Sequence, residues 1–449
     1  NAVNNQVTFT GGTIGQDING GFTDNGDAAG NRVIMGGGEV TGHVVGGFSS
    51  TGKAENNEVM FSGGKASSII GGRSMNAGNV SGNTVNISGG EILYDAFGGL
   101  AGTGDAMGNS VTINAGTVDK VWGGFSSDSA VTGNQVNITN IAASTTGNVY
   151  GGESYKSDAI ENTVTMSGGI VNRAVFAGKS TDGNVTGNSV DITGGSMNSS
   201  VTGGYSVNGT ASANTVTMSG GTVNGSVTGG EAKVDASGNS VTISGNGQVS
   251  GVVFGAYSVD GTAIGNSVTI SGNGQVSGAV FGAYSESGTA IGNNVTINGG
   301  QVGDVSGGYS GSGTASTNTV TINSGTVYRV IGGNGVAAIG NIVTINSQVN
   351  GDVNGGLAYT GDATGNNVTI NSNVTGGVYG GWADSGNANN NIVTITSGQV
   401  GYPVYGGYSD SFIGTASGNM VNISSGTLNG DVYGGYAGSG IASGNIVNI

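Results

Sequence analysis

The chain has 449 residues and a net charge of −16, with 97 glycines, one proline and no cysteine. Charged residues are only 8% of it, against about 25% in ordinary domains, so Asn, Ser and Thr must supply the polar surface. The acidic balance argues against a nucleic-acid partner, the missing Cys excludes a disulfide framework, and no apolar run is long enough for membrane insertion by this segment.

A five-residue pattern, written Asn266-Ser-Val-Thr-Ile270 in one copy, recurs along the whole chain. Its Asn returns at intervals that average about 26 residues, a period typical of solenoids, propellers or arrays. Val follows two residues after this anchor Asn in every copy, and Ile, Met or Phe two residues further on. The anchors are Asn5, Asn31, Asn57, Asn83, Asn109, Asn134, Asn162, Asn188, Asn214, Asn239, Asn266, Asn293, Asn318, Asn341, Asn366, Asn391, Asn419 and Asn445. We predict an all-β fold, one continuous parallel β-solenoid domain over residues 1–449 with about 17 coils of about 26 residues.

Residues 266–292 illustrate the elements predicted in each repeat. Residues 267–271 alternate polar and apolar, which is typical of a half-buried strand, and the Gly-Asn-Gly of 272–274 indicates a turn. Residues 275–280 alternate again. After a Gly-Ala pair, which is Gly-Gly in most copies, residues 284–285 begin a third segment. The pattern predicts three short strands and three corners per repeat.

The same alternation predicts which side chains form the core. Val268 and Ile270 should be buried, Val276 and Val280 should share one face, and Thr269 should be exposed between the first two. Inward Val and Ile would stack on their copies in adjacent coils. Three residues before each later anchor stands Ala in 14 copies and Val in three, which predicts an inward site at a tight corner with room for little more than a methyl group.

The anchor Asn has a structural interpretation and a functional one. Gly precedes it in 12 of the 17 later copies, which suits a corner with positive φ. An inward column of Asn amides would bond to its neighbours and to the corner backbone. The alternative is a row of ligand-binding amides, but recurrence in every coil favours a role in the scaffold.

Enzymatic chemistry finds little support in the residues. A site on a β-helix would need clustered carboxylates, or a metal with a basic residue, on adjacent coils. The acids are dispersed, and His43 is the only histidine. One charged column, Glu39, Lys65 and Glu91, fits a solvated salt-bridge ladder. We expect no enzymatic activity, no catalytic residue, no cofactor and no metal site.

The residue three positions after the anchor points outward between Val and Ile, and it is Thr in 11 of 18 copies. The second half of the chain holds an unbroken series of Thr217, Thr242, Thr269, Thr296, Thr321, Thr344, Thr369 and Thr394. Adjacent coils would space these hydroxyls by about 4.8 Å. Thr is favoured on any exposed strand, and the alternatives are an ice-binding face and a glycan or partner face.

Aromatic residues flank the Gly pair on both sides. Those before it are Phe97, Trp122, Tyr150, Phe176, Phe254, Phe281, Tyr379, Tyr405 and Tyr433. Those after it are Phe22, Phe48, Phe125, Tyr205, Tyr257, Tyr284, Tyr309, Trp382, Tyr408 and Tyr436. Strict alternation would put one set inside and the other outside unless the Gly pair makes a bend. We expect partial burial at a corner, with Tyr379, Trp382, Tyr405 and Tyr433 as candidate contacts for sugars or proteins.

The recurring phrases Gly-Asn-Ser-Val-Thr-Ile-Ser-Gly-Gly, Val-Tyr-Gly-Gly-Tyr-Ser and Gly-Thr-Ala-Ser-Gly-Asn resemble the Gly/Asn/Thr-rich repeats of bacterial autotransporter passenger domains. The resemblance covers essentially all 449 residues. It implies a right-handed β-helix that is secreted or displayed at the bacterial cell surface. No catalytic residue is carried over from it.

These observations favour an extracellular or bacterial cell-surface rod that acts as an adhesin or as the stalk of one. Its partners would be host glycans or surface proteins, or further copies that associate end to end. The alternatives are a self-assembling structural fibre and an ice-binding solenoid that uses the Thr series. The chain starts beside the first anchor and stops within a copy, so we expect an excerpt of a longer chain with flanking repeats or caps.

Overall fold

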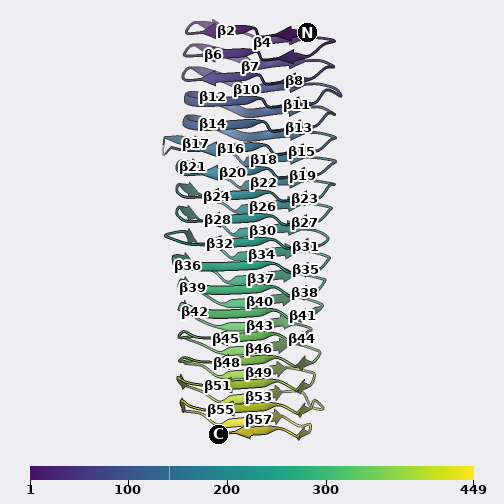
Figure 1. Ribbon diagram of the computed structural model, residues 1–449, viewed down its shortest axis with the longest axis vertical. Helices are drawn as coiled ribbons and strands as arrows, with labels where there is room; N and C mark the ends of the chain where they lie inside the picture. The colour runs from purple at the N-terminus through teal and green to yellow at the C-terminus, as the bar shows by residue number, and fades with distance from the viewer. Residues whose placement is uncertain (141) are drawn as a thin grey trace. The chain divides into compact units, whose positions relative to one another are not determined.

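The structure is a computed structural model that describes residues 1–140 and 142–449. Its regular elements are all β-strands, and no helix of the described residues is long and apolar enough to cross a membrane. The chain forms two compact units, Asn1–Ala232 and Lys233–Ile449, and each is a stack of parallel β-coils (Figure 1). The predicted parallel β-solenoid, with 17 anchor-to-anchor intervals near 26 residues, is confirmed. That the two units form one continuous domain stays a prediction.

Each coil consists of three main strands. In unit 2 one coil contains β36 (Ser267–Val276), β37 (Val280–Ser285) and β38 (Ala290–Ile291). In unit 1 the first strand is split in many coils, as in β24 (Ser189–Ile192) and β25 (Ser196–Met197), which precede β26 (Val201–Ser206) and β27 (Ala211–Ser212).

The predicted third segment was wrong in one respect. Tyr284 and Ser285 continue the strand that contains the Gly-Ala pair, and the third strand is the short β38. The reason is that the Gly pair lies inside a strand, with the backbone of the next coil packed directly on it, and does not form a corner. A Cβ on Gly282 would lie 2.3 Å from the carbonyl oxygen of Gly307.

The coils pair in register, so that equivalent positions of successive repeats lie side by side. Strand β36 lies between β32 (Ser240–Ile243) and β39 (Asn294–Val302), and all pair in parallel. Val268 is matched with Val241 and Val295. Parallel pairing of equivalent residues lets every β-branched side chain pack on a copy of itself, which suits the stiff χ1 rotamers of Val and Ile.

The interior consists of these stacked aliphatic columns. Val268, Ile270 and Val280 are fully buried and Val276 nearly so, as predicted. Fully burying one such side chain stabilises the fold by about 1.5–3 kcal/mol. Thr269 lies between two buried residues on the outer face, but it is half-buried and not exposed. Its neighbours at about 4.8 Å above and below cover the flanks of each Thr in the column.

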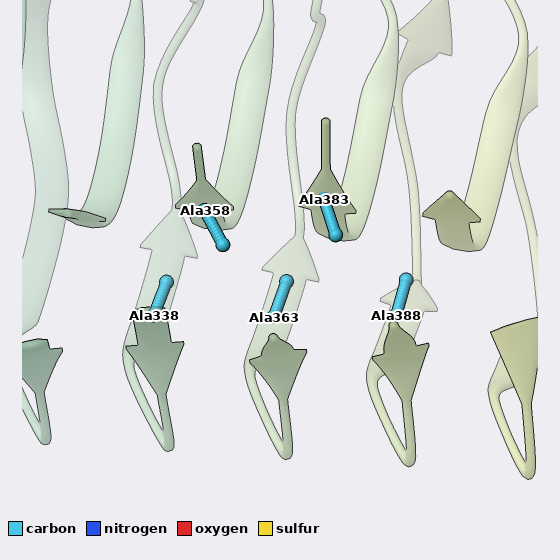
Figure 2. Packing of buried hydrophobic residues seen from close by; sticks show 5 residues of the cluster. All are labelled: Ala338, Ala358, Ala363, Ala383 and Ala388. Carbon is cyan, nitrogen blue, oxygen red and sulfur yellow. The ribbon is translucent and has the colours of Figure 1, made fainter. Parts of the chain in front are cut away.

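The column of small residues before the anchor forms the predicted tight corner. Figure 2 shows Ala338, Ala363 and Ala388 in one row, facing Ala358 and Ala383, and all five are fully buried. They belong to β44 (Ala337–Ile339), β47 (Ala363–Thr364), β50 (Ala388–Asn389), β46 (Val353–Ala358) and β49 (Val378–Ala383). Two backbone segments meet here with only methyl groups between them.

The anchor asparagines form the predicted inward ladder. Asn266 Nδ2 donates to Asn293 Oδ1 over 3.0 Å and to the carbonyl oxygen of Ala236 over 3.0 Å. The backbone N–H of Asn266 also donates to Asn293 Oδ1, over 2.9 Å. Anchors from Asn31 to Asn419 are buried, so these bonds satisfy corner groups that would otherwise be unpaired.

Every residue that precedes an anchor adopts positive φ. Glycines fill this position in most copies, for example Gly265 with φ of 64° and Gly292 with φ of 63°. Six copies use another residue: Asn4, Asn56, Glu161, Ala213, Thr317 and Asn390, with φ between 52° and 57°. The turn that places the anchor amide inside requires a left-handed backbone, and the chain adopts it even where the residue is unfavourable.

A buried serine column is a feature that the sequence analysis missed. Ser285 Oγ donates to the carbonyl oxygen of Gly261 in the preceding coil over 2.8 Å and accepts from the backbone N–H of Gly288 over 2.9 Å. Serine is replaced by Ala in some coils, as at Ala358 and Ala383. The sequence pattern that could have predicted this column is the Ser that directly follows the second aromatic position.

Candidate functional site

The Thr series is a genuine ladder in unit 2. Thr242, Thr269 and Thr296 pair in register, and the series continues in the same way to Thr394. Thr217 lies in unit 1, where its neighbour along the column is Asp191. These hydroxyls stand on a regular outer face, and all but Thr217 are half-buried.

A second polar ladder borders the Thr series, two residues further along the chain. Asn323 Nδ2 donates to Asn298 Oδ1 over 2.8 Å, Asn346 Nδ2 to Asn323 Oδ1 over 2.9 Å, and Asn371 Nδ2 to Asn346 Oδ1 over 2.7 Å. Because these exposed amides bond to one another, they hold a fixed orientation. The face is therefore regular and uncharged over several coils.

The two aromatic sets lie on the same outer face, which corrects the expectation of a corner. In β53 (Val404–Ser409), Tyr405 and Tyr408 contact edge to face, with ring centroids 5.1 Å apart, across the intervening Gly pair. Both Gly residues of the pair are buried, so alternation is interrupted there and the flanking residues point to the same side.

In unit 2 the candidate aromatics stack along the coils. Tyr379 and Tyr405 stack with ring centroids 5.2 Å apart, and Tyr405 and Tyr433 stack at 4.8 Å. The rings of Trp382 and Tyr408 lie 4.9 Å apart but are tilted by 53°. Burial, with a smaller contribution from the charge of Asp352, raises the pKa of Tyr379 to about 12. The phenol is therefore neutral and a hydrogen-bond donor at physiological pH.

Carboxylates flank this aromatic cluster. Trp382 Nε1 donates to Asp384 Oδ1 over 2.7 Å, and the Tyr433 hydroxyl donates to Asp431 Oδ2 over 3.1 Å. Residues 330–449 contain no Lys, Arg or His, but they contain Asp352, Asp362, Asp384, Asp410 and Asp431. The cluster thus offers aromatic rings and hydrogen-bond acceptors together.

In unit 1 the same face holds a buried ion pair. Glu153 is only 3% exposed, and its carboxylate accepts from Trp122 Nε1 and from Lys179 Nζ, each over 2.7 Å. Lys179 Nζ also lies 5.2 Å from the centre of the Tyr150 ring. Burial lowers the pKa of Lys179, but the adjacent Glu153 carboxylate outweighs it, and the net pKa is raised. Both charges are satisfied within the protein, so we assign the pair to packing.

The charged column found in the sequence is a surface ladder. Glu39 pairs in register with Lys65, and Lys65 Nζ lies 3.4 Å from Glu91 Oε2 with both side chains largely exposed. Such pairs contribute about 0–1 kcal/mol. Within residues 1–140 and 142–449, no group of three or more His, Cys, Asp or Glu is arranged to hold a metal ion.

Unit 2 has a concave surface that the sequence analysis did not single out. Gln248, Gln275 and Gln301 are exposed and pair in register, and each precedes a buried Val. The same position in the following coils is held by Thr326, Gln348, Asn373 and Gln399. We call these seven residues the amide groove.

Hollows lie on both sides of this column. The first, of about 500 Å³, is lined by Gln248, Gln275, Gln301 and Thr326 and, on its other wall, by turn residues such as Asn246 and Asn273. The second, of about 360 Å³, shares Gln275, Gln301 and Thr326 and adds Tyr328. A third, of about 340 Å³, is lined by Gln348, Asn373, Gln399, Asn429 and their neighbours. A signal was present in the sequence, because an amide or Thr recurs directly before one core Val.

Comparison with protein-family models, with curated proteins and with solved structures finds no significant match.

Proposed function

We propose that this chain is a repeat region of a bacterial surface or secreted protein that acts as an adhesin, or as the stalk that holds one. The observation that carries the proposal is the outer surface, where aromatic rings stack from coil to coil in both units and where, in unit 2, Thr and Asn side chains form in-register ladders. Many weak and equivalent contacts add up to firm attachment when they are made at the same time. Host glycans and surface proteins are partners that offer such repeated contacts.

The aromatic cluster of unit 2 is the contact surface that we favour. Its rings are half-exposed and flanked by carboxylates, which suits sugar rings, with apolar C–H faces and hydroxyl edges, as well as protein side chains. Enzymatic activity is not part of the proposal. The Thr, Asn and aromatic columns all lie on the surface of an aliphatic core, an arrangement that suits a scaffold for binding.

Saturable binding of the purified chain to host cells tests the proposal. We expect the Tyr405→Ser/Tyr408→Ser double variant to bind at least tenfold more weakly, since loss of each stacked aromatic removes contact area. Tyr94→Ser is the matched control, because Tyr94 is exposed on unit 1 outside the stacked cluster. Absence of saturable binding by the intact chain would reject adhesion and leave the stalk role.

Two alternatives have their own measurements. Electron microscopy of the purified chain without ligand would reveal a self-assembling fibre. The in-register Thr ladder from Thr242 to Thr394 favours ice binding as a further candidate, and thermal hysteresis of the solution tests it. Replacing Thr296 and Thr321 by Val should abolish that hysteresis if the ladder is responsible.

A further inference from the structure

We infer that the amide groove of unit 2 binds an extended, uncharged oligosaccharide. The inference deepens the proposed function and rests on it, because it names a ligand class and a second surface for attachment. Its evidence is separate from the aromatic cluster and the Thr ladder. It stands on the groove's shape, its free hydrogen-bonding groups, its lack of charge and its isolated tyrosines.

In the later coils of the groove, Gln348 Nε2 donates to Asn350 Oδ1 over 2.8 Å and Asn373 Oδ1 accepts from the Gln399 backbone N–H over 2.9 Å. The side chains of Gln248, Gln275 and Gln301 are held outward. Val249, Val276 and Val302 are buried beside them, so strand alternation directs the preceding Gln residues to the surface. Among the residues that the structure describes, the side chains of Gln275 and Gln301 have no hydrogen-bond partner in the protein. A carboxamide offers two donors and an acceptor with two lone pairs, which matches the adjacent hydroxyl groups of a sugar ring.

The lining determines the kind of ligand. None of the residues that line the three hollows is charged, although the chain as a whole carries a net charge of −16. An ionic ligand would therefore gain no partner in the groove. The hollows measure about 340 to 500 Å³, within the range of about 300–1,000 Å³ that is usual for sites that bind small ligands.

Two tyrosines supply surfaces for stacking. Tyr328 lines the second hollow and is 62% exposed, and Tyr402, next to Gly401 of the third hollow, is 65% exposed. Neither ring packs on another aromatic ring within the described parts of the chain, in contrast to the stacked rings of the aromatic cluster. A solitary exposed ring beside hydrogen-bonding amides suits the apolar face of a sugar.

The repeat of the groove indicates a polymer. Gln248, Gln275 and Gln301 are successive partners in the parallel sheet, so equivalent amides recur at about 4.8 Å. An extended chain of sugars would meet the same amide at each of these three coils, and its affinity would rise with its length. The amide groove and the Thr ladder are different surfaces. The groove is concave, whereas the Thr ladder of the ice-binding alternative is a regular row on a strand.

The full chain is first tested on an array of neutral and charged glycans that includes linear glucose, mannose and galactose oligomers of increasing length. Titration calorimetry then measures the affinity of each oligomer that the array shows to bind. We expect a neutral oligomer to bind, and its affinity to rise with length. The Gln275→Ala/Gln301→Ala variant and the Tyr328→Ala variant should each lose at least tenfold in affinity. The Asn294→Ala variant changes an exposed residue of β39 outside the groove and should match the wild type, and circular dichroism verifies that all variants are folded.

Three results would overturn the inference: no neutral oligomer retained, only charged glycans retained, or equal affinity in the Gln double variant. Two separate measurements, binding to neutral glycans and binding to cells, distinguish failure of this inference from failure of the proposed function. Cell binding without neutral glycan binding rejects the groove and leaves the adhesin. Neutral glycan binding with the expected variant pattern, but without cell binding, supports the groove and rejects host-cell adhesion.

Discussion

At the residue scale, the left-handed corner before each anchor is the position with the clearest backbone cost. Thr317 adopts φ of 52° there, a conformation that costs a residue with a side chain about 1–2 kcal/mol. Glycine adopts this conformation without strain. Its unfolded chain has more conformational entropy to lose on folding, which costs about 0.4–1 kcal/mol of stability. We therefore expect Thr317→Gly to raise the free energy of unfolding by about 1 kcal/mol, measured by urea denaturation.

The matched control is one coil earlier. Gly292 has φ of 63° at the equivalent corner, and Gly292→Thr should lower stability by about 1–2 kcal/mol. A loss of stability in Thr317→Gly would mean that its hydroxyl, which donates to the Ser316 carbonyl oxygen over 2.7 Å, contributes more than the strain costs.

Two adjacent residues of one strand should differ strongly in how much stability is lost when each is replaced by Asp. Val268 is fully buried between two other valines, and Val268→Asp places an unpaired carboxylate among aliphatic groups, which costs about 3 kcal/mol or more. Thr269 is half-buried on the outer face, where the carboxylate of Thr269→Asp can reach water. We expect a cost of about 1 kcal/mol there. Equal losses in chemical denaturation would contradict the register of β36.

One carboxyl makes stability depend on pH. Burial raises the pKa of Glu231, so the folded state holds its proton more tightly than the unfolded state. The fold is therefore favoured at low pH, and that contribution is lost as the pH rises from the unfolded value of about 4.3 through the raised folded pKa. Glu231→Gln should stabilise the protein at neutral pH, and the gain should vanish below about pH 4 in denaturation measured across pH.

A matched control for the substitution is Glu55, whose carboxylate lies 3.3 Å from Lys53 Nζ at the surface. Glu55→Gln removes a surface ion pair and should change stability by less than about 1 kcal/mol. If Glu231→Gln were neutral or destabilising at pH 7, the folded protein would have to stabilise the carboxylate form.

At the scale of the element, the asparagine ladder connects each coil to the next. The Asn293 side chain accepts from the Asn266 backbone N–H over 2.9 Å and donates to the Ala263 carbonyl oxygen over 3.0 Å. Asn293→Ala leaves both backbone groups buried without these partners, at about 1–3 kcal/mol for each. We expect a total loss of about 2–5 kcal/mol in chemical denaturation. Asn294→Ala, at the exposed neighbour, should change stability by less than about 0.5 kcal/mol.

At the scale of the whole molecule, identical register predicts that one entire coil is dispensable. Removing residues 266–292 would bring Val295 onto Val241 and Asn293 onto Asn239, the partners that Val268 and Asn266 have now. The shortened chain should fold, with an unchanged circular dichroism signal per residue, since each coil shares its core only with its neighbours. Removing 266–278 alone should lower the stability sharply, because the strands that follow would no longer pair with the equivalent strands of the preceding coil. Equal behaviour of the two deletions would contradict the stacking.

Much of the architecture follows from local pattern. The recurrence of Asn, the alternation around Val268 and Ile270 and the small residues at Ala263 and Ala290 predicted parallel coils, the buried columns and the tight corner. This works because in a solenoid each position meets a copy of itself, so a one-dimensional period carries the long-range pairing. The asparagine ladder followed in the same way, from an amide that recurs where the backbone needs a partner.

Other features depended on tertiary structure. Periodicity could not decide on which side Tyr405 and Tyr408 lie, because the answer depends on how closely the next coil packs on the Gly pair between them. The burial of Thr269 depends on the flanks of neighbouring coils, and the hollows beside Gln275 depend on the path of the turn opposite it. Period and alternation are properties of the chain alone and therefore determined the coil, whereas close packing and surface curvature arise only when coils are brought together, and these decided the candidate sites.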